Sequence, residues 1–343
     1  MPRTGHAILA SLALSIASAA SAQLGPINPP AGVVGDTGPD LSQIDGRTPL
    51  SAQNTPGDFD SVFRISRPGS YYLTADLTVP AGDRGIEIAI SEVSIDLNGY
   101  TIRGLNGSLE AIGVVGSGDR VRVSGGTVRG TAGGMFLRSD FVVEDMIIEA
   151  MQGDGVRGTF LGIVRSCRFD DIDGADAHGV SVNCCAEVVG CRFASSTTTA
   201  AMIEGTQNVN VQGCWFNNLR GPAIQVSNEC IVAGNSVEFT SFSLPASSAV
   251  VIVANRAMVR GNSIEANSNT NTSVNGILAT GTQNRIEDNH ITGGRIQSTG
   301  SDNVIIGNTM DTAISATASD FVGPSITSPA QMTTASRFAN IIF

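Results

Sequence analysis

The sequence contains no lysine, and all 20 of its basic residues are arginine. The absence of lysine excludes a Schiff-base mechanism and a lysine general base. With 31 acidic residues the formal net charge is −11 at pH 7, and such a charge repels phosphate backbones. The composition therefore argues against nucleic acid as a partner.

Aromatic residues make up only 5% of the chain and charged residues 15%, although hydrophobic residues reach 41%. Glycine accounts for 40 of the 343 residues, and long amphipathic helical windows are lacking. No apolar run reaches the roughly 20 residues that cross a bilayer, so we expect no transmembrane segment. Small residues and short strands favour one long repeat array over two ordinary domains.

The N-terminal residues MPRTGHAILASLALSIASAASAQ combine the basic Arg3, an apolar run from Ala7 to Ile16 and small residues before Gln23. This pattern predicts a signal peptide over residues 1–22 and an exported protein, either secreted, periplasmic or at the cell surface. Residues 23–62 are rich in Pro, Gly, Asp and Ser and are typical of a linker or arm.

One template covers seven segments of the second half of the chain: VRSCRF at 164, VVGCRF at 188, VQGCWF at 211, VAGNSV at 232, VRGNSI at 259, IEDNHI at 286 and IIGNTM at 305. Its fourth position is Cys167, Cys191, Cys214, Asn235, Asn262, Asn289 and Asn308, at steps of 19 to 27 residues. The positions three before and two after it are always apolar, and glycine usually precedes it. We expect these three columns to face inward, with the glycine supplying a tight turn.

A unit of this length with two or three short strands cannot bury its own apolar face, so the units must stack at the strand spacing of about 4.8 Å. The sequence therefore predicts an all-β fold, a parallel β-helix (solenoid) with an inward Cys/Asn ladder. Each buried amide would bond to its neighbours above and below. Weaker copies at 93, 121 and 141 bring the total to about ten coils.

The segments NVIIGNTM, MVRGNSI and VSIDLNGYTIRG resemble the repeats of right-handed parallel β-helix proteins, the group that includes pectate lyases and NosD-like proteins. The opening GSYYLTADLTVPAGDRGIEI is similar to a secreted bacterial β-helix family whose members mostly lack an assigned activity. The resemblance covers roughly residues 69–319 and implies the right-handed fold rather than a reaction. We expect the β-helix, with its N-terminal cap strands, over residues 63–319 and a C-terminal cap or tail over 320–343.

The three ladder cysteines raise a choice between metal ligands, disulfide partners and core residues. Two ligands of one zinc lie at most about 4.6 Å apart, whereas Cys167 and Cys214 would be two coils, roughly 9.6 Å, apart. A bridge between adjacent coils misses the preferred Cβ separation and leaves one thiol over, which favours buried core thiols. Cys230 falls in another inward column. Cys184 and Cys185 are sequence neighbours and their redox state stays open: strand alternation would turn one thiol outward, where it could be modified or could bridge two molecules.

The residue directly after the ladder should face outward, and its first three members are Arg168, Arg192 and Trp215. We call this set the Arg–Trp stripe. Two guanidiniums beside the only tryptophan of the chain suit an acidic sugar, through ring stacking and carboxylate pairing. The alternative is an ordinary solvated face.

The segment RFDDIDGADAHGV, residues 168–180, places Asp170, Asp171, Asp173, Asp176 and His178 close together. Clustered carboxylates can hold Ca²⁺ or supply an acid and a base, so these are candidate metal and catalytic residues. AHGVSV resembles the Gly-His-Gly of polygalacturonases. That family has its Asp-Asp pair and its His on separate coils and also uses an Arg-Ile-Lys segment, which a chain without lysine cannot supply.

These patterns favour non-catalytic binding of an extracellular or cell-surface polysaccharide, with no cofactor required and Ca²⁺ as an option. The alternatives are a polysaccharide lyase or glycoside hydrolase and a structural or adhesion protein of the cell surface. A lyase would need an arginine base beside Asp-bound Ca²⁺, which Arg168 or Arg192 near the acidic segment could imitate.

Overall fold

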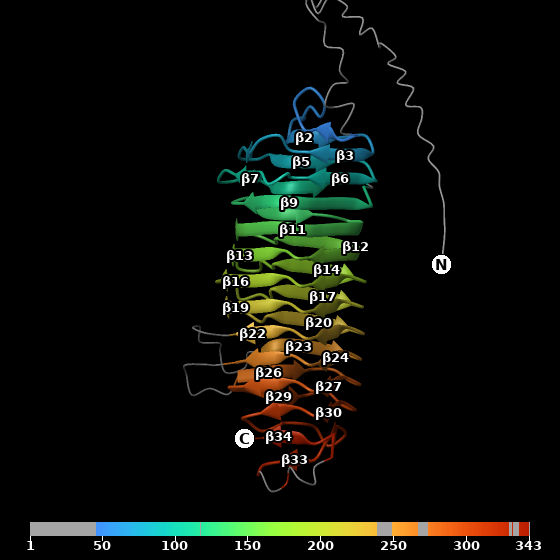
Figure 1. Ribbon diagram of the computed structural model, residues 1–343, viewed down its shortest axis with the longest axis vertical. Coiled ribbons are helices and arrows are strands. Elements are labelled where there is room, and N and C mark those ends of the chain that lie inside the picture. Colours follow the sequence, from blue (N-terminus) through green and yellow to red (C-terminus); the bar gives the residue numbers. More distant parts are fainter. Residues whose placement is uncertain are drawn as a thin grey trace, which may run out of the picture. The chain divides into compact units, whose positions relative to one another are not determined.

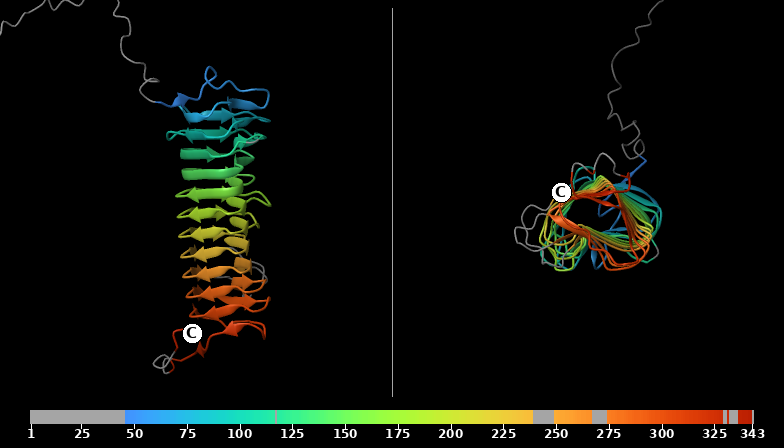
Figure 2. Two further views of the ribbon diagram at one scale, coloured as in Figure 1. Left: turned by 90° about the vertical axis from the view of Figure 1, so that its right-hand side faces the viewer. Right: turned by 90° about the horizontal axis from the view of Figure 1, so that it is seen from below.

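The computed structural model describes residues 46–116, 118–238, 249–266, 274–328, 331 and 336–342. The predicted signal peptide and the predicted linker up to residue 45 lie outside the described residues. The compact unit Asp45–Phe343 is a parallel β-helix of about eleven turns, close to the ten expected from the sequence. Figure 1 shows its strands stacked turn upon turn, and Figure 2 shows the turns overlying one another around a common interior.

The strands form three stacks, each made of parallel pairs between successive turns. The first sheet consists of β2 (Ser61–Ile65), β5 (Arg84–Ile88), β8 (Glu110–Val114), β10 (Gly133–Phe136), the first half of β12 (Val156–Arg165), β14 (Val180–Cys184), β17 (Ile203–Gln207), β20 (Ile224–Asn228), β23 (Ala249–Asn255), β26 (Val274–Ala279) and β29 (Gly294–Ser298). The second sheet consists of β1 (Thr48–Pro49), β3 (Gly69–Tyr72), β6 (Val93–Asp96), the first halves of β9 (Val121–Arg129) and β11 (Ser139–Met151), the second half of β12, β15 (Glu187–Val189), β18 (Asn210–Gln212), β21 (Ile231–Ala233), β24 (Met258–Arg260), β27 (Arg285–Glu287), β30 (Val304–Ile306) and β32 (Phe321–Val322).

The third sheet completes each turn. It consists of β4 (Leu77–Val79), β7 (Thr101–Gly104), the second halves of β9 and β11, β13 (Arg168–Ile172), β16 (Arg192–Ser196), β19 (Trp215–Leu219), β22 (Ser236–Glu238), β25 (Ser263–Glu265), β28 (His290–Thr292), β31 (Thr309–Met310) and β34 (Asn340–Ile342), with β33 (Ser325–Ile326) pairing to β34. No helix among the described residues is long and apolar enough to cross a membrane.

The strands follow from the alternation of apolar and polar residues. In β14, Val180 and Val182 are buried while Ser181 between them is only partly covered, as the period of two requires. The three columns predicted to face inward are buried at every one of the seven repeats, which confirms that prediction. Two phenylalanine contacts add to this core, because the ring of Phe193 stacks on those of Phe169 and Phe216 at centroid distances of 4.7 and 4.9 Å.

The asparagine ladder is continuous. The Oδ1 atom of Asn262 accepts hydrogen bonds from the backbone N and the Nδ2 of Asn235, at 2.9 and 3.0 Å. Its own Nδ2 donates to Val232 O and to Asn289 Oδ1, at 3.0 and 2.9 Å. The amides are therefore satisfied inside the core, which is why a polar residue is tolerated there. The ladder extends past the last predicted rung, because the backbone N of Asn308 donates to Asn340 Oδ1 at 3.0 Å.

A second, shorter ladder stands in the column of Cys230. The Nδ2 of Asn284 donates to Asn303 Oδ1 at 2.9 Å, and the backbone N of Ala257 donates to Asn284 Oδ1 at the same distance. Both asparagines are buried. Two columns rather than one therefore carry buried polar rungs towards the C-terminal end.

The corner before the ladder needs a left-handed backbone. Gly190 has a φ of 61°, and a Cβ added there would meet no atom within 4 Å, so conformation and not space favours glycine. The same position holds Ser166 and Asp288 in other turns, with φ values of 54° and 55°. The turn role predicted for the glycines is confirmed.

The β-helix begins earlier in the chain than the sequence pattern predicts. β1 pairs in parallel with β3, and Leu50 is only 2% exposed. Residues 48–50 of the segment predicted as a linker therefore belong to the solenoid.

Candidate functional site

The Arg–Trp stripe lies on the outer face of the third sheet. Arg168 on β13 is in register with Arg192 on β16, which is in register with Trp215 on β19. Both arginines are exposed and Trp215 is partly buried. The Cζ atom of Arg192 lies 4.3 Å from the centroid of the Trp215 ring, so the guanidinium stacks on the indole. The structure thus brings the three predicted residues together in one column.

The charge of the stripe is partly compensated. Arg168 forms an ion pair with Asp170, which follows it by two residues on the same outer face and is only 7% exposed. Asp170 is in register with Ala194, so no further charge stands beside Arg192 in that column. Arg192 has no ion pair among the described residues, so the uncompensated positive charge of the stripe lies on its guanidinium.

The acidic segment does not gather its carboxylates at one point. Asp170 pairs with Arg168, while Asp171 sits at a left-handed corner with a φ of 53° and is exposed. Asp173 accepts hydrogen bonds from the backbone N and Oγ1 of Thr197, at 3.1 and 2.8 Å. Partial burial and the neighbouring charges of Asp173 and Asp170 raise the pKa of Asp171. Calcium binding by these residues and Asp176 stays a prediction.

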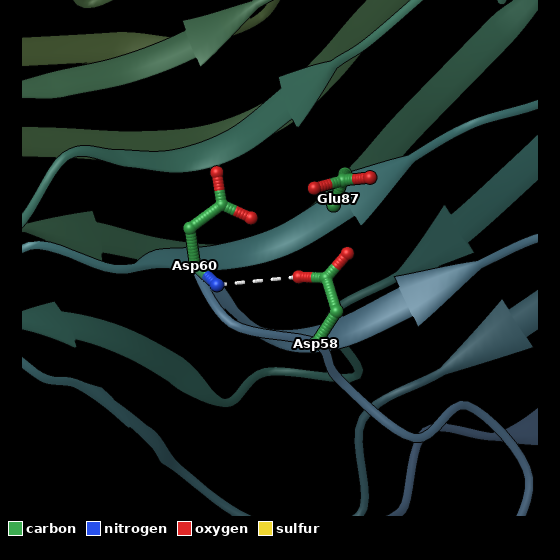
Figure 3. Close-up of side chains that lie close together, drawn as sticks. All are labelled: Asp58, Asp60 and Glu87. Carbon is green, nitrogen blue, oxygen red and sulfur yellow. Dashed lines mark hydrogen bonds between the residues drawn. The ribbon is translucent and has the colours of Figure 1, made fainter.

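Among the described residues, a different set brings three ligand atoms within 4.8 Å of one another: Asp58, Asp60 and Glu87 (Figure 3). Arg64 lies between Asp58 and Glu87, with its Nε 3.3 Å from the Glu87 carboxylate. Arg84 pairs with Asp60 at 2.7 Å. The two guanidiniums supply the positive charge these carboxylates need, so the set is explained as an ion-pair network of the first turns.

His178 is held between two carboxylates from neighbouring turns. Its Nδ1 lies 2.9 Å from Asp154 Oδ1 and its Nε2 lies 3.2 Å from Glu204 Oε2. Its backbone N also donates to Asp154 Oδ1, at 2.9 Å. Burial lowers the pKa of His178, but the hydrogen bond to Asp154 and the charges of Asp154, Glu204 and Asp176 outweigh it and raise the pKa above its ordinary value.

A concave site of about 400 Å³ opens on the first sheet beside His178. Its lining includes Glu110, Phe136, Asp154, Arg157 and Asp176. Of these, the sequence patterns had singled out only Asp176. The others stand in turns without a conspicuous motif, yet Asp154 and His178 each precede a ladder cysteine by thirteen residues. Alignment of the repeats by that offset would have placed them side by side.

The four isolated thiols behave as predicted. Cys167, Cys191, Cys214 and Cys230 are free and buried, which confirms the core interpretation. Contact with the Cys191 thiol together with burial raises the pKa of Cys167 and of Cys214, and burial raises the pKa of Cys230. Hydrogen bonds from Cys167 and Cys214 lower the pKa of Cys191, but that residue is only 1% exposed. Since all four thiols are buried in the core, we interpret them as packing residues.

The structure decides the state of the neighbouring pair, which the sequence leaves open. Cys184 and Cys185 are joined to each other by a disulfide, so neither thiol is open to modification or to a bridge between molecules. Strand alternation does not hold here, because Cys185 follows the last residue of β14 at a corner with a φ of 60°. Beyond a left-handed residue neighbouring side chains no longer point to opposite faces, and the two sulfurs can meet.

No family model matches the chain, and no curated protein matches it. Solved structures do match its fold. A mutant tailspike protein of E. coli bacteriophage HK620 in complex with a pentasaccharide has a TM-score of 0.51 and 15% identity, over 80% of this chain and 59% of the tailspike. The alginate lyase of Paenibacillus sp. str. FPU-7 has a TM-score of 0.48 and 12% identity, over 75% of this chain and 93% of the lyase.

A mannuronan C-5 epimerase A-module of Azotobacter vinelandii is similar at a TM-score of 0.44 and 13% identity, over 75% of this chain and 82% of the module. At these identities the likeness concerns the fold. The chain is therefore a parallel β-helix protein, and its function has to be inferred from its own surface.

Proposed function

We propose that the protein binds an extracellular or cell-surface polysaccharide without cleaving it, through the Arg–Trp stripe. The observation that carries the proposal is the stack of Arg192 on Trp215 with Arg168 in register one turn away. The face of the indole that Arg192 leaves uncovered offers a flat surface for a sugar ring, and the free edge of the Arg192 guanidinium offers paired donors to a carboxylate. A tailspike of the same fold is in complex with a pentasaccharide, so the fold is compatible with saccharide binding.

The ligand class that suits the stripe is an acidic glycan. Asp170 pairs with Arg168 and Asp171 also lies near it, whereas Arg192 has no ion pair among the described residues and keeps a positive charge on a chain whose net charge is −11. A polyanion approaching elsewhere on the chain is repelled, so binding depends on these two arginines and weakens as salt screens them. Export by the predicted signal peptide belongs to the same proposal, because such glycans lie outside the cell.

The geometry supports binding better than catalysis. The guanidinium of Arg168 is ion-paired with Asp170, which opposes its loss of a proton as a lyase base would require. Both ring nitrogens of His178 already face carboxylates. A lyase or hydrolase remains the alternative function, and an adhesion protein without glycan affinity is the other.

The single tryptophan supplies the test, because its fluorescence reports on the stripe alone. Titration of oligogalacturonate into the protein should change the Trp215 emission with a saturable profile. Arg168→Gln and Arg192→Gln should weaken binding at least tenfold, and the loss should shrink at high salt. Trp215→Ala, followed by calorimetry, should also weaken it.

The matched control is Arg260→Gln, an exposed arginine on β24 of another sheet, which should leave binding unchanged. Reducing-end release or an unsaturated product would instead favour an enzyme. If the Arg168/Arg192/Trp215 triple variant still binds acidic glycans, the Arg–Trp stripe is not the binding site.

A further inference from the structure

The site beside His178 is part of a longer groove across the first sheet. A second cavity of about 240 Å³ adjoins the first, and Phe136 lines both. The first cavity lies at the start of strands β8 and β10, where Glu110 and Gly133 line it, and the second lies at their ends, where Val114 and Arg138 line it. The groove therefore runs along the strands, whereas the Arg–Trp stripe runs from turn to turn.

The recess is explained by the lengths of the connections between strands. The connections that lead into β10 and β12, residues 130–132 and 152–155, are short, and Gly133 at the start of β10 and Gly153 in the second connection line the cavity without side chains. The next connection, residues 173–179, is longer and adds Asp176 and Ala177 to the lining. Short glycine-containing turns followed by a longer one leave a recess of the kind in which ligands bind.

An aromatic ring stands in the middle of this recess. Phe136 is only partly buried, and the Cζ atom of Arg157 lies 5.7 Å from its centroid. Phe160, which lines the second cavity, is 50% exposed. Partly exposed rings offer the apolar faces on which the C–H face of a pyranose packs.

The larger cavity of the groove has more acidic than basic lining residues. Its lining holds the carboxylates of Glu110, Asp154 and Asp176 against the guanidinium of Arg157, and Glu110 is already paired with Arg84. Asp154 and Asp176 disfavour the carboxylate of a uronic acid, whereas hydroxyl groups would find charged acceptors in them.

We propose that this groove is a second saccharide site, which binds a chain of sugars without acidic groups. Phe136 packs against the sugar ring, Asp154 and Asp176 accept hydrogen bonds from its hydroxyls, and Arg157 donates to them. The protein then holds two glycans of different charge on two sheets. This site stands whether or not the Arg–Trp stripe binds a glycan.

The test is calorimetry with a panel of neutral gluco-, manno- and xylo-hexasaccharides. Phe136→Ala should raise the Kd of a bound neutral hexasaccharide at least tenfold, and Asp176→Asn several-fold, since each removes one recognition element. Asp173→Asn is the matched control, because it changes a carboxylate of the same connection that does not line the groove. Trp215→Ala should leave neutral binding unchanged.

Three outcomes would contradict a neutral saccharide site in the groove. These are that no neutral hexasaccharide binds, that its binding is unchanged in both Phe136→Ala and Asp176→Asn, or that Trp215→Ala abolishes its binding. If Phe136→Ala fails to fold, as judged by circular dichroism, the exposed Asp176→Asn decides alone. The experiment also separates the two proposals. If the Arg–Trp stripe binds no glycan, oligogalacturonate binding is absent, while the binding of a neutral hexasaccharide still weakens in the groove variants.

Discussion

Replacement of Asn262 by alanine probes the feature on which the stack depends. The change removes the Oδ1 atom that accepts the hydrogen bond of the buried Asn235 backbone N–H. An orphaned buried donor costs roughly 1–3 kcal/mol, and the broken bonds to Val232 and Asn289 add about 1 kcal/mol. We expect a loss of about 3 kcal/mol in the free energy of unfolding.

Thermal unfolding followed by circular dichroism should show this loss as a fall in Tm of about 6 °C, at about 2 °C per kcal/mol for a domain of this size. Ser263→Ala, the exposed next residue, is the matched control and should shift Tm by less than about 1 °C. The double variant Asn235→Ala/Asn262→Ala should lose less than the sum of the single changes, because the two amides bond to each other. A small shift in Asn262→Ala, or additive losses, would refute the ladder as a stabilising chain of hydrogen bonds.

The pKa of His178, followed by NMR, should lie above the ordinary value of about 6.5, because the charges of Asp154 and Glu204 outweigh its burial, and Asp154→Asn should lower it. The pKa of His178 is higher in the folded than in the unfolded protein. The stability that its ion pairs contribute should therefore be fully present below about pH 6.5 and be lost as the pH rises through the folded pKa. A free energy of unfolding that does not change over this pH range, or the same pH dependence in His178→Gln, would contradict the ion pairs of His178 with Asp154 and Glu204. A thiol reagent should find no reactive cysteine in the native protein and four after denaturation without reductant, since four cysteines are free and buried; a count of six would contradict the Cys184–Cys185 disulfide.

The candidate sites could be predicted from the sequence only where the repeat carried them. The Arg–Trp stripe follows the ladder by one residue in each turn, so strand alternation alone places Arg168, Arg192 and Trp215 in one outward column. The groove could be found in this way only in part. Asp154 and His178 each stand thirteen residues before a ladder cysteine, so the repeat aligns them, but Glu204 stands ten residues before Cys214 and the repeat does not show that it faces His178.

The sequence by itself determined the parallel β-helix, its inward columns and its core thiols. These are periodic features, and a period shows in the order of residues because every turn repeats the same packing problem. Only the tertiary structure decided where the connections leave a recess, that Glu204 faces His178 from the other side, and that Cys184 bonds to Cys185. Such features depend on connection length and corner geometry, which differ from turn to turn and leave no repeated signal in the sequence.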